Sequence, residues 1–283
     1  MEASTRNRWI SIYQVDAFTS ETFKGNPAAV CILRNRLNDT LLKSIAAEMN
    51  LSETAFVKPL ENVPLKEAKT FSLRWFTPEI EVSLCGHATL ATAAILFREV
   101  GINEEQIRFK TKSGVVTATK DKKGISLDFP SDNPIMIDPP KSLLKTLGIS
   151  EFKKIKYGEH TKKLLIHMVS GEDVYNLKPN YELMKSATTK KPIKGVIVTA
   201  GGSPPYDFVS RFFAPWVGIN EDPVTGAAHT VLAPYWSKLL NKRQMLAYQA
   251  SKRGGELAVR LKPNSRVDLI GEAVIVLKGE LHV

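Results

Sequence analysis

The feature of this sequence that most constrains its fold is a short motif that occurs twice. Residues 74–78 read Arg-Trp-Phe-Thr-Pro, and residues 211–215 read Arg-Phe-Phe-Ala-Pro. Each copy is followed, eight or eleven residues after its proline, by a glycine that opens an apolar segment, Gly86 or Gly226. The arginines of the two copies are 137 positions apart in a chain of 283 residues. This spacing predicts two similar halves rather than a solenoid, whose repeats are ~20 to 50 residues long.

Each copy is expected to combine a strand with a buried helix. Apolar and polar residues alternate over 71–75, which predicts a strand with one buried face. The prolines that close the motifs end these strands, because proline donates no ladder hydrogen bond. The segment 86–99 is apolar on nearly all sides, so a helix there must be buried all round. The segment 226–240 is similar, although Pro234 is expected to bend it or to shorten its hydrogen-bond ladder.

Strand signals fill much of the remaining chain and predict an α+β protein. Strands are expected at 28–33, 115–119, 125–129, 257–261, 267–270 and 273–278. Further helices are expected at 40–49, with Asp39 as a possible cap, and at 141–147. The proline-rich stretch 130–140 is the best boundary, which gives an N-terminal half of residues 1–128 and a C-terminal half of residues 129–272.

The composition, with 43 % hydrophobic and 24 % charged residues, is that of a folded protein. No stretch approaches the ~18 apolar residues of a membrane-spanning helix, and the polar residues 1–9 lack the apolar core of a signal peptide. Two cysteines provide no disulfide framework, which suits a reducing compartment. We therefore expect a cytoplasmic protein with no membrane partner.

The net charge of +10 raises nucleic acid as a partner. Twelve lysines against five acidic residues in the segment 141–194 supply +7 of this excess. The segment has no arginine for bidentate phosphate contacts and no aromatic cluster for base stacking. A solvated lysine surface is therefore favoured over a nucleic-acid site.

The two glycine-opened helices suggest where chemistry takes place. A helix start presents free backbone N–H groups and a partial positive charge. If the starts at Gly86 and Gly226 meet between the halves, they form a pocket for a carboxylate. The alternative is that each start is capped locally, for instance by Asp222 or by a serine. The residues alone leave both interpretations open.

Four side chains near these segments are candidates for the site. Glu53 precedes an apolar strand, where burial would raise its pKa and make it a proton carrier; composition alone favours an exposed acid at a strand end. His87 either contacts a ligand or fills the helix start. Asp222 either orients a substrate or caps the turn. Asn26 belongs first to a tight turn and second to a ligand loop. The five histidines show no ligand-like spacing with cysteine or acidic residues, so no metal is expected.

These segments also match a known family, in order along essentially the whole chain. The motifs are Asp-Ala-Phe-Thr at 16–19 with Phe-Lys-Gly-Asn-Pro-Ala-Ala-Val at 23–30, Met-Asn-Leu-Ser-Glu-Thr-Ala-Phe-Val at 49–57, the motif at 74–78 with Cys-Gly-His-Ala-Thr-Leu at 85–90, and Glu-Asp-Pro-Val-Thr-Gly at 221–226. On these motifs the chain resembles the PhzF-like isomerases, and especially their animal branch, the phenazine biosynthesis-like domain-containing proteins.

The resemblance implies a diaminopimelate-epimerase-like fold, with two pseudo-symmetric halves, each a barrel-like sheet around a central helix. It further implies a homodimer, and a last strand at about 273–283 that returns to the N-terminal half. The family's general acid/base matches Glu53, and its histidine and aspartate match His87 and Asp222. The family reaction moves a proton within a cyclic acid without cofactor or metal, which makes Glu53 the leading candidate base.

Two positions depart from related proteins. Ala227 stands where the family often has serine, so one hydroxyl that could hold a ligand is absent while the backbone N–H remains. The related two-thiol epimerases place a cysteine before each glycine, whereas here Cys85 precedes the first and Thr225 the second. Because a threonine hydroxyl is far too weak an acid to replace a thiolate, racemisation by paired thiols is not expected.

The resulting hypothesis is a cofactor-independent isomerase of a small carboxylic acid, with its site between the halves. Glu53 would carry the proton, while His87 and Asp222 would orient polar groups. The residues expected to bind the substrate are Gly86, Gly226, Ala227 and Asn26. The alternative is a non-catalytic binding or regulatory protein that keeps the fold. The substrate itself is not identified by the sequence.

Overall fold

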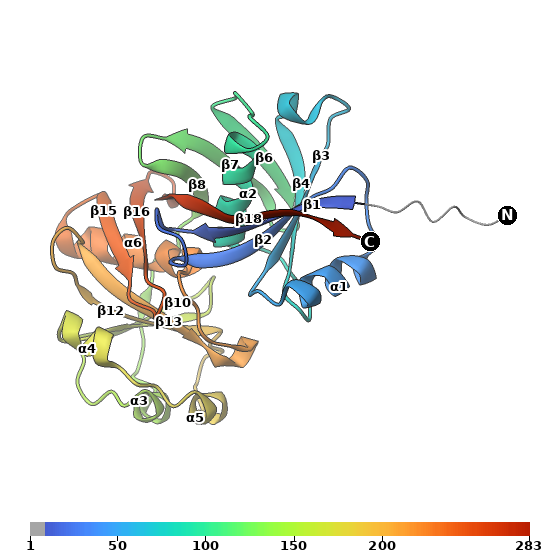
Figure 1. Ribbon diagram of the computed structural model, residues 1–283. Helices are drawn as coiled ribbons and strands as arrows, with labels where there is room; N and C mark the ends of the chain where they lie inside the picture. The colour runs from blue at the N-terminus through green and yellow to red at the C-terminus, as the bar shows by residue number, and fades with distance from the viewer. Residues whose placement is uncertain (1–8) are drawn as a thin grey trace.

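The computed structural model describes residues 9–283, which form two lobes, each with a curved sheet around one long helix (Figure 1). The first lobe begins with β1 (Trp9–Ala17), β2 (Asn26–Ile32), α1 (Asp39–Met49), β3 (Thr54–Pro59), the 3₁₀ turn η1 (Leu65–Glu67), β4 (Thr70–Phe76) and β5 (Glu81–Val82). It continues with α2 (Gly86–Arg98), β6 (Gln106–Thr111), β7 (Gly114–Asp121) and β8 (Gly124–Pro130).

Within residues 9–283, the second lobe follows the same order of strands and has four helices where the first has two. Its elements are β9 (Ile135–Met136), α3 (Lys141–Leu147), β10 (Lys154–Gly158), β11 (Lys163–His167), α4 (Gly171–Asn176), α5 (Tyr181–Ser186), β12 (Gly195–Gly201) and β13 (Phe208–Ala214). The chain then continues with the 3₁₀ turn η2 (Pro215–Val217), β14 (Ile219–Glu221), α6 (Gly226–Leu240), β15 (Gln244–Gln249), β16 (Gly255–Lys262), β17 (Arg266–Gly271) and β18 (Ala273–His282).

The strand pairings of the two lobes are duplicated. In the first lobe β2 and β3 are parallel, β4 pairs antiparallel with β3 and parallel with β6, and β6, β7 and β8 form an antiparallel meander. In the second lobe β11, β12, β13, β15, β16 and β17 repeat these relations in the same sequence. The expected α+β fold with two pseudo-symmetric halves is confirmed.

The lobes also exchange strands. The strand β8 pairs with β17 and joins the two sheets, whereas β9 pairs with β10 of the second lobe and β18 pairs with β1 of the first. Figure 1 shows β18, in red, lying along the blue strand β1. The division of the chain at residue 128 remains a prediction, and its residues 1–8 lie outside the described part of the chain.

The repeated arginines occupy equivalent positions. Arg74 makes two hydrogen bonds to Glu81, of 2.7 and 2.8 Å, and Arg211 makes two to Glu221, of 2.7 and 2.9 Å. Each guanidinium also lies about 5 Å from the ring of the phenylalanine two residues later, 5.0 Å in the first copy and 4.9 Å in the second. The short motif therefore specifies the same local structure twice: an arginine that ties strand β4 or β13 to the strand after it.

The helices α2 and α6 are buried inside their sheets, as their apolar composition predicts. Residues 87–96 of α2 are all buried. The helix α6 continues through Pro234 to Leu240, but its hydrogen-bond ladder lacks one bond there, in line with the predicted shortening of the ladder. Proline leaves the carbonyl of Thr230 without its helical donor, and the backbone N–H of Asp132 donates to that carbonyl instead, at 3.0 Å.

Two local predictions need correction. The cap of α1 is Asn38, whose side chain accepts from the backbone N–H of Leu41. Asp39 lies in the first helical turn and instead pairs with Arg74. The last strand extends beyond the 273–278 read from the residues and ends at His282, within the range of about 273–283 that the resemblance implies. Among residues 9–283, no helix combines the length and apolar character needed to cross a membrane.

Candidate active site

The starts of α2 and α6 meet at the centre of the molecule. A methyl group added to Gly86 would lie 3.4 Å from the Cα of Gly226, and the reverse contact is also 3.4 Å. Within the described chain, neither helix start has a capping side-chain hydrogen bond. Local side-chain capping, which the residues alone left open, is therefore not found. Gly86 and Ala227 are only half-buried, which leaves their backbone groups partly exposed.

The Glu53 carboxylate lies beside this junction. It comes from the connection between α1 and β3, and its side chain is only 14 % exposed. Burial raises the pKa of Glu53 above its ordinary value, and hydrogen bonds from Ser52 and Cys85 partly oppose the shift. Its Oε2 atom lies 3.4 Å from Nε2 of His87 but, among residues 9–283, has no hydrogen-bond partner. This 3.4 Å contact is therefore an approach of polar groups rather than a formed hydrogen bond.

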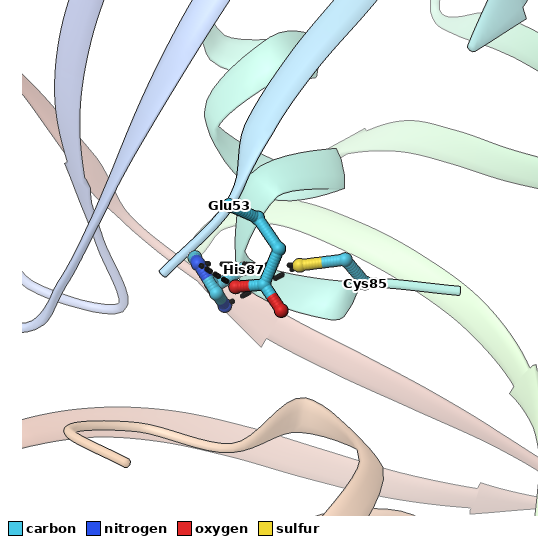
Figure 2. A group of neighbouring side chains, drawn as sticks. All are labelled: Glu53, Cys85 and His87. Carbon is cyan, nitrogen blue, oxygen red and sulfur yellow. Dashed lines mark hydrogen bonds and ion pairs between the residues drawn. The ribbon is translucent and has the colours of Figure 1, made fainter. Parts of the chain in front are cut away.

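The His87 ring connects this carboxylate to the second lobe. Nε2 faces Glu53 and, at 3.3 Å, the hydroxyl of Ser52, while Nδ1 faces the amide nitrogen of Asn26 at 3.2 Å. Burial lowers the pKa of His87, so the ring is neutral at physiological pH, although the charge of Asp222 opposes the shift. Figure 2 shows the imidazole, the Glu53 carboxylate and the Cys85 thiol converging on one point.

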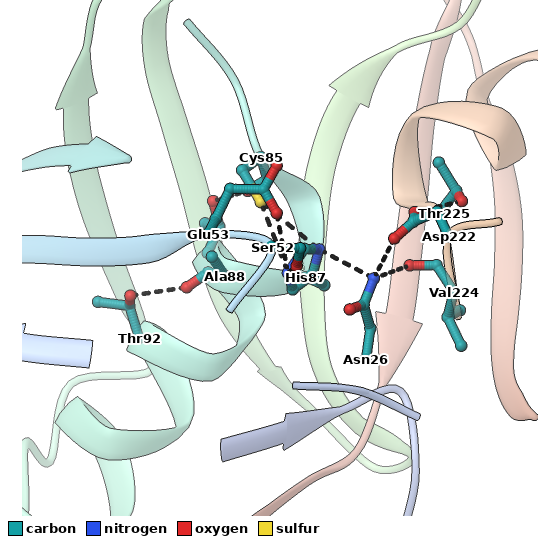
Figure 3. A network of polar contacts seen from close by, with 11 residues as sticks. Asn26, Ser52, Glu53, Cys85, His87, Ala88, Thr92, Asp222, Val224 and Thr225 are labelled. Carbon is teal, nitrogen blue, oxygen red and sulfur yellow. Dashed lines mark hydrogen bonds and ion pairs between the residues drawn. The ribbon is translucent and has the colours of Figure 1, made fainter. Parts of the chain in front are cut away.

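Asn26 is the side chain that bridges the lobes. It is fully buried, and its Nδ2 atom donates to Oδ1 of Asp222 at 2.8 Å and to the carbonyl of Val224 at 2.9 Å. Figure 3 shows it between His87 on one side and these two acceptors on the other. These two acceptors take both hydrogens of the NH₂ group, so the 3.2 Å approach of Nδ1 of His87 is a polar contact with the amide nitrogen rather than a hydrogen bond donated by Asn26. The Cys85 sulfur also lies 3.5 Å from Nδ1, while Nε2 faces Ser52 and Glu53.

Asp222 lies at the entrance to α6 and is also buried. Its Oδ2 accepts from the hydroxyl of Thr225 at 2.5 Å. Burial raises the pKa of Asp222, whereas His87 and the hydrogen bonds from Thr225 and Asn26 lower it. Asp222 therefore orients the Thr225 and Asn26 side chains and does not bond to a backbone N–H of α6.

Two further residues contact the candidate site but were assigned no role from the sequence. Ser52 stands in the motif but was given no role. Gln249, fully buried, receives the backbone N–H of Thr225 at 2.9 Å. Lys163, expected on a solvated surface, is half-buried, and burial lowers its pKa to about 8 while the charges of Asp132 and Asp222 oppose the shift. Nine of the twelve lysines in 141–194 are exposed, as expected of a solvated surface.

The arrangement also bears on metal binding. Ligand atoms of Glu53, Cys85 and His87 lie within 4.8 Å of one another, a juxtaposition that the spacing of histidines in the sequence does not reveal. A metal needs a lone pair on the imidazole nitrogen, and the other ring nitrogen then donates to an acceptor. Here Nδ1 faces the NH₂ group of Asn26, which is not an acceptor. Burial also raises the pKa of Cys85 well above 9.0, which favours the thiol over the thiolate that metals bind. These groups fit proton transfer better than metal ligation.

Comparison with known proteins identifies the family of this chain. A family model described as phenazine biosynthesis-like protein, PhzC-PhzF, matches residues 15–279. The chain belongs to the PhzC-PhzF family. Mouse phenazine biosynthesis-like domain-containing protein 1 is 46 % identical over 284 residues, which cover 96 % of this chain and 99 % of the mouse protein. An uncharacterized isomerase of Halalkalibacterium halodurans is 49 % identical over 273 residues, which cover 95 % and 97 % of the two chains.

The solved structures lead to the same family. A PhzF-family protein of Enterococcus faecalis is 41 % identical and superposes with a TM-score of 0.87, covering 98 % of this chain and 100 % of that one. A predicted epimerase of Pseudomonas aeruginosa, 18 % identical, and a hydroxyproline epimerase of Agrobacterium vitis, 12 % identical, share the fold alone, with TM-scores of 0.71 and 0.56. The resemblance stated from the motifs is confirmed, and membership of the PhzC-PhzF family supports an isomerase-type function.

Proposed function

We propose that this PhzC-PhzF protein is a cofactor-independent isomerase that moves a proton within a small carboxylic acid, with Glu53 as its general acid/base. The observation that carries the proposal is the buried Glu53 carboxylate beside His87, where the uncapped starts of α2 and α6 face each other. A carboxylate whose pKa is raised towards neutrality can both accept and return a proton.

The proposed reaction needs only groups of this chain and the substrate. Glu53 removes a proton from a substrate carbon: the C–H bond breaks, an O–H bond forms on Glu53, and the electron pair spreads into the conjugated acid. The backbone N–H groups of Gly86, His87, Gly226 and Ala227 hold the substrate carboxylate and stabilise this charge. The O–H bond of Glu53 then breaks as a C–H bond forms at a second carbon.

The two remaining site residues orient the substrate in this proposal. His87 offers its Nε2–H to a polar group of the acid, and Asp222 accepts from a hydroxyl or amino group. Asn26 keeps both at the required separation through its contacts of 3.2 and 2.8 Å. Neither metal nor cofactor takes part in any step.

Deuterium exchange tests the proposal directly. The protein is incubated in D₂O with a library of small cyclic and amino acids, and uptake is measured by mass spectrometry. The wild-type protein is expected to label at least one acid, and Glu53→Gln is expected to lower the rate by roughly 10²- to 10⁴-fold. Glu48→Gln, which removes an exposed carboxylate from α1, is the matched control and keeps the wild-type rate.

Two results would contradict the proposal. Undiminished exchange in Glu53→Gln would remove Glu53 as the base. Binding of an acid with no exchange in the wild-type protein would favour the alternative, a non-catalytic binding protein with this fold.

The proposal extends to assembly and location. We expect a cytoplasmic homodimer whose partner molecules are small acids, and neither nucleic acid nor membrane. Light scattering during size-exclusion chromatography gives the mass directly, and a mass of one chain, 31.4 kDa, would contradict the dimer.

A further inference from the structure

Lys163, the first residue of β11, is a half-buried lysine without an ion-pair partner in residues 9–283. Lys190 and Lys191 of the same lysine-rich segment each pair with a carboxylate. The Nζ atom of Lys163 makes one hydrogen bond, to the carbonyl of Thr161, and its length of 3.5 Å is beyond the usual range. An ammonium has three N–H donors and is costly to bury unpaired. Its placement therefore points to a partner that this part of the chain does not supply.

The strand β11 directs Lys163 towards the buried helix α6. Side chains alternate along a strand, so Lys163, Leu165 and His167 share one face of β11. On this face Nδ1 of His167 lies 2.6 Å from the hydroxyl of Tyr235 in α6, and Leu165 packs in the core that contains α6. Leu164, on the opposite face, belongs to a separate core. Lys163 therefore begins the row of side chains that faces α6.

A run of hydrogen bonds places Lys163 beside the first turns of that helix. The hydroxyl of Thr230 donates to the carbonyl of Ala227 at 3.0 Å, and the carbonyl of Thr230 accepts from the backbone N–H of Asp132 at 3.0 Å. Oδ2 of Asp132 accepts from both the backbone N–H and the hydroxyl of Thr161, each at 2.8 Å. Lys163 follows Thr161 by two residues and approaches its carbonyl. The lysine therefore lies at the end of the lobe where α6 begins.

The charges around Lys163 agree with this position. Burial lowers the pKa of Lys163 to about 8; the charge of Asp132 opposes the shift, that of Lys194 adds to it, and that of Asp222 opposes it. From β13 the ammonium faces the uncharged ring of Phe212, whose centroid is 5.7 Å from Nζ. Because Asp222 belongs to the candidate site, its influence on Lys163 places the ammonium at the second-lobe side of that site.

We propose that Lys163 binds the carboxylate of the substrate at the start of α6, as the charged partner of the backbone N–H groups of Gly226 and Ala227. The inference rests on the proposed function, because it assigns a binding group to the acid that the isomerase would take. The substrate is then an organic anion whose carboxylate reaches the second lobe while its reacting carbon faces Glu53 in the first.

Binding of benzoate tests the inference without catalysis. Benzoate is a small cyclic carboxylate, and benzamide is its uncharged analogue of the same shape. Lys163→Met keeps an unbranched side chain without the charge. It is expected to raise the Kd of benzoate, measured by NMR titration, by roughly ten- to a hundredfold, the effect of one charge-assisted hydrogen bond. Benzamide should bind the variant and the wild type alike. Lys162→Met, an exposed neighbour, is the matched control and should leave both Kd values unchanged.

The pH dependence of binding is a second readout. In the wild-type protein the Kd of benzoate should rise as pH increases through the pKa of Lys163, about 8, because the positive charge is lost. Benzoate itself stays ionised throughout this range. In Lys163→Met the Kd should be weaker and independent of pH there.

A purely structural role of Lys163 would give different results. Removal of an unpaired, half-buried charge should not lower the free energy of unfolding in urea, so Lys163→Met should be at least as stable as the wild type. Lower stability together with wild-type binding of benzoate would assign the lysine to the fold and overturn the inference. If the variant does not fold, the wild-type profile decides, since a Kd of benzoate that is constant through the pKa would equally overturn it.

Deuterium exchange separates this inference from the proposed function. With an acid that the wild-type protein labels, Lys163→Met should raise KM by the same factor as the Kd of benzoate, with little change in kcat. An unchanged KM, in a protein whose exchange still depends on Glu53, would overturn the role of Lys163 alone. Binding of benzoate that depends on Lys163, in a protein that exchanges no acid, would contradict the proposed function alone. A wild-type protein that does not prefer benzoate to benzamide would overturn the inference.

Discussion

At the scale of single residues, the site keeps titratable groups largely out of water. Glu53, His87 and Asp222 come from three separate segments, and burial is the largest influence on the pKa of each. For the two acids burial raises the pKa, and for the histidine it lowers it, so all three shifts favour the uncharged forms. Such shifts affect the stability of the fold as well as its chemistry.

The stability of the protein should therefore depend on the charge of Glu53. Its folded pKa lies above the ordinary 4.5, so its contribution is fully present below about that pH and is lost as pH rises through the raised pKa. Glu53→Gln stays neutral and escapes the loss. The free energy of unfolding in urea is expected to be higher for this variant than for the wild type, by a margin that grows from pH 4.5 towards neutrality. Glu48→Gln controls for the loss of one charge, and a margin independent of pH would contradict the prediction.

Removal of the Asn26 side-chain amide should break the hydrogen bonds that join the two lobes at the candidate site. In Asn26→Ala the buried acceptors on Asp222 and Val224 lose their donor, which costs about 1–3 kcal/mol of unfolding free energy. Exchange should also slow at least about tenfold, since His87 is no longer oriented. Asn35→Ala removes an exposed amide and is expected to change neither quantity. Wild-type exchange in folded Asn26→Ala would show that Asn26 is dispensable.

At the scale of secondary-structure elements, α2 and α6 approach each other closely at their first residues. Gly86 and Gly226 are the residues of contact, and neither has a positive φ. Backbone strain therefore does not require glycine at either position, and a methyl group there would touch the neighbouring helix at 3.4 Å.

Replacing Gly226 by alanine should weaken substrate binding while leaving the free energy of unfolding nearly unchanged. In Gly226→Ala the new methyl group meets Gly86 and Leu269 at 3.4 Å, which are ordinary contacts, so the free energy of unfolding should change by less than about 1 kcal/mol. The methyl group covers part of the proposed carboxylate site, so KM should rise. The double variant with Gly86→Ala places two methyl groups between the helices and should be less stable than the sum of the single variants. An additive double variant would argue against this close approach.

At the scale of the whole molecule, hydrogen bonds of Arg253 join the two lobes beside the candidate site. Arg253, between β15 and β16, bonds to the buried carboxylate of Asp16 at 2.7 Å and to the carbonyls of Lys24 and Gly25 at 2.8 Å. The next residue, Asn26, is the one that contacts His87 and Asp222. These contacts of Arg253 between the lobes therefore also hold the neighbouring residue Asn26 in place.

Loss of the ion pair between Arg253 and Asp16 should destabilise the fold. Arg253→Gln leaves the Asp16 carboxylate, 1 % exposed, without its ion pair and is expected to cost roughly 2–3 kcal/mol of unfolding free energy in urea. Lys252→Gln, an exposed neighbour, is the control and should cost little. Equal stabilities of the two variants would show that the ion pair does not hold the lobes together.

The lysine-rich segment 141–194 belongs to the same scale. Its exposed lysines are expected to carry solvating charge only, so immobilised oligonucleotides should not retain the protein at physiological salt. Retention that weakens steeply with salt, and that is lost when Lys153 and Lys154 are changed to glutamine, would instead indicate a nucleic-acid surface.

Much of the molecule follows from local sequence. The duplicated arginine motif, the alternation over 71–75 and the two apolar helices predicted the paired lobes, because periodicity and proline positions act over a few residues. The motifs at 49–57, 85–90 and 221–226 indicated the family and made Glu53, His87 and Asp222 the candidate site residues. Local signals misplaced the cap of α1, since Asn38 and Asp39 are equally good caps by residue type.

What the sequence by itself determined, then, is the repeat, the fold class and the residue types of the site. Only the tertiary structure decided which groups meet: that Gly86 contacts Gly226, that Asn26 bridges His87 and Asp222, and that Gln249 supports Thr225. These contacts join residues up to 196 positions apart, and no periodicity or short motif records them. They depend on how two curved sheets close around their helices, which is a property of packing over the whole chain.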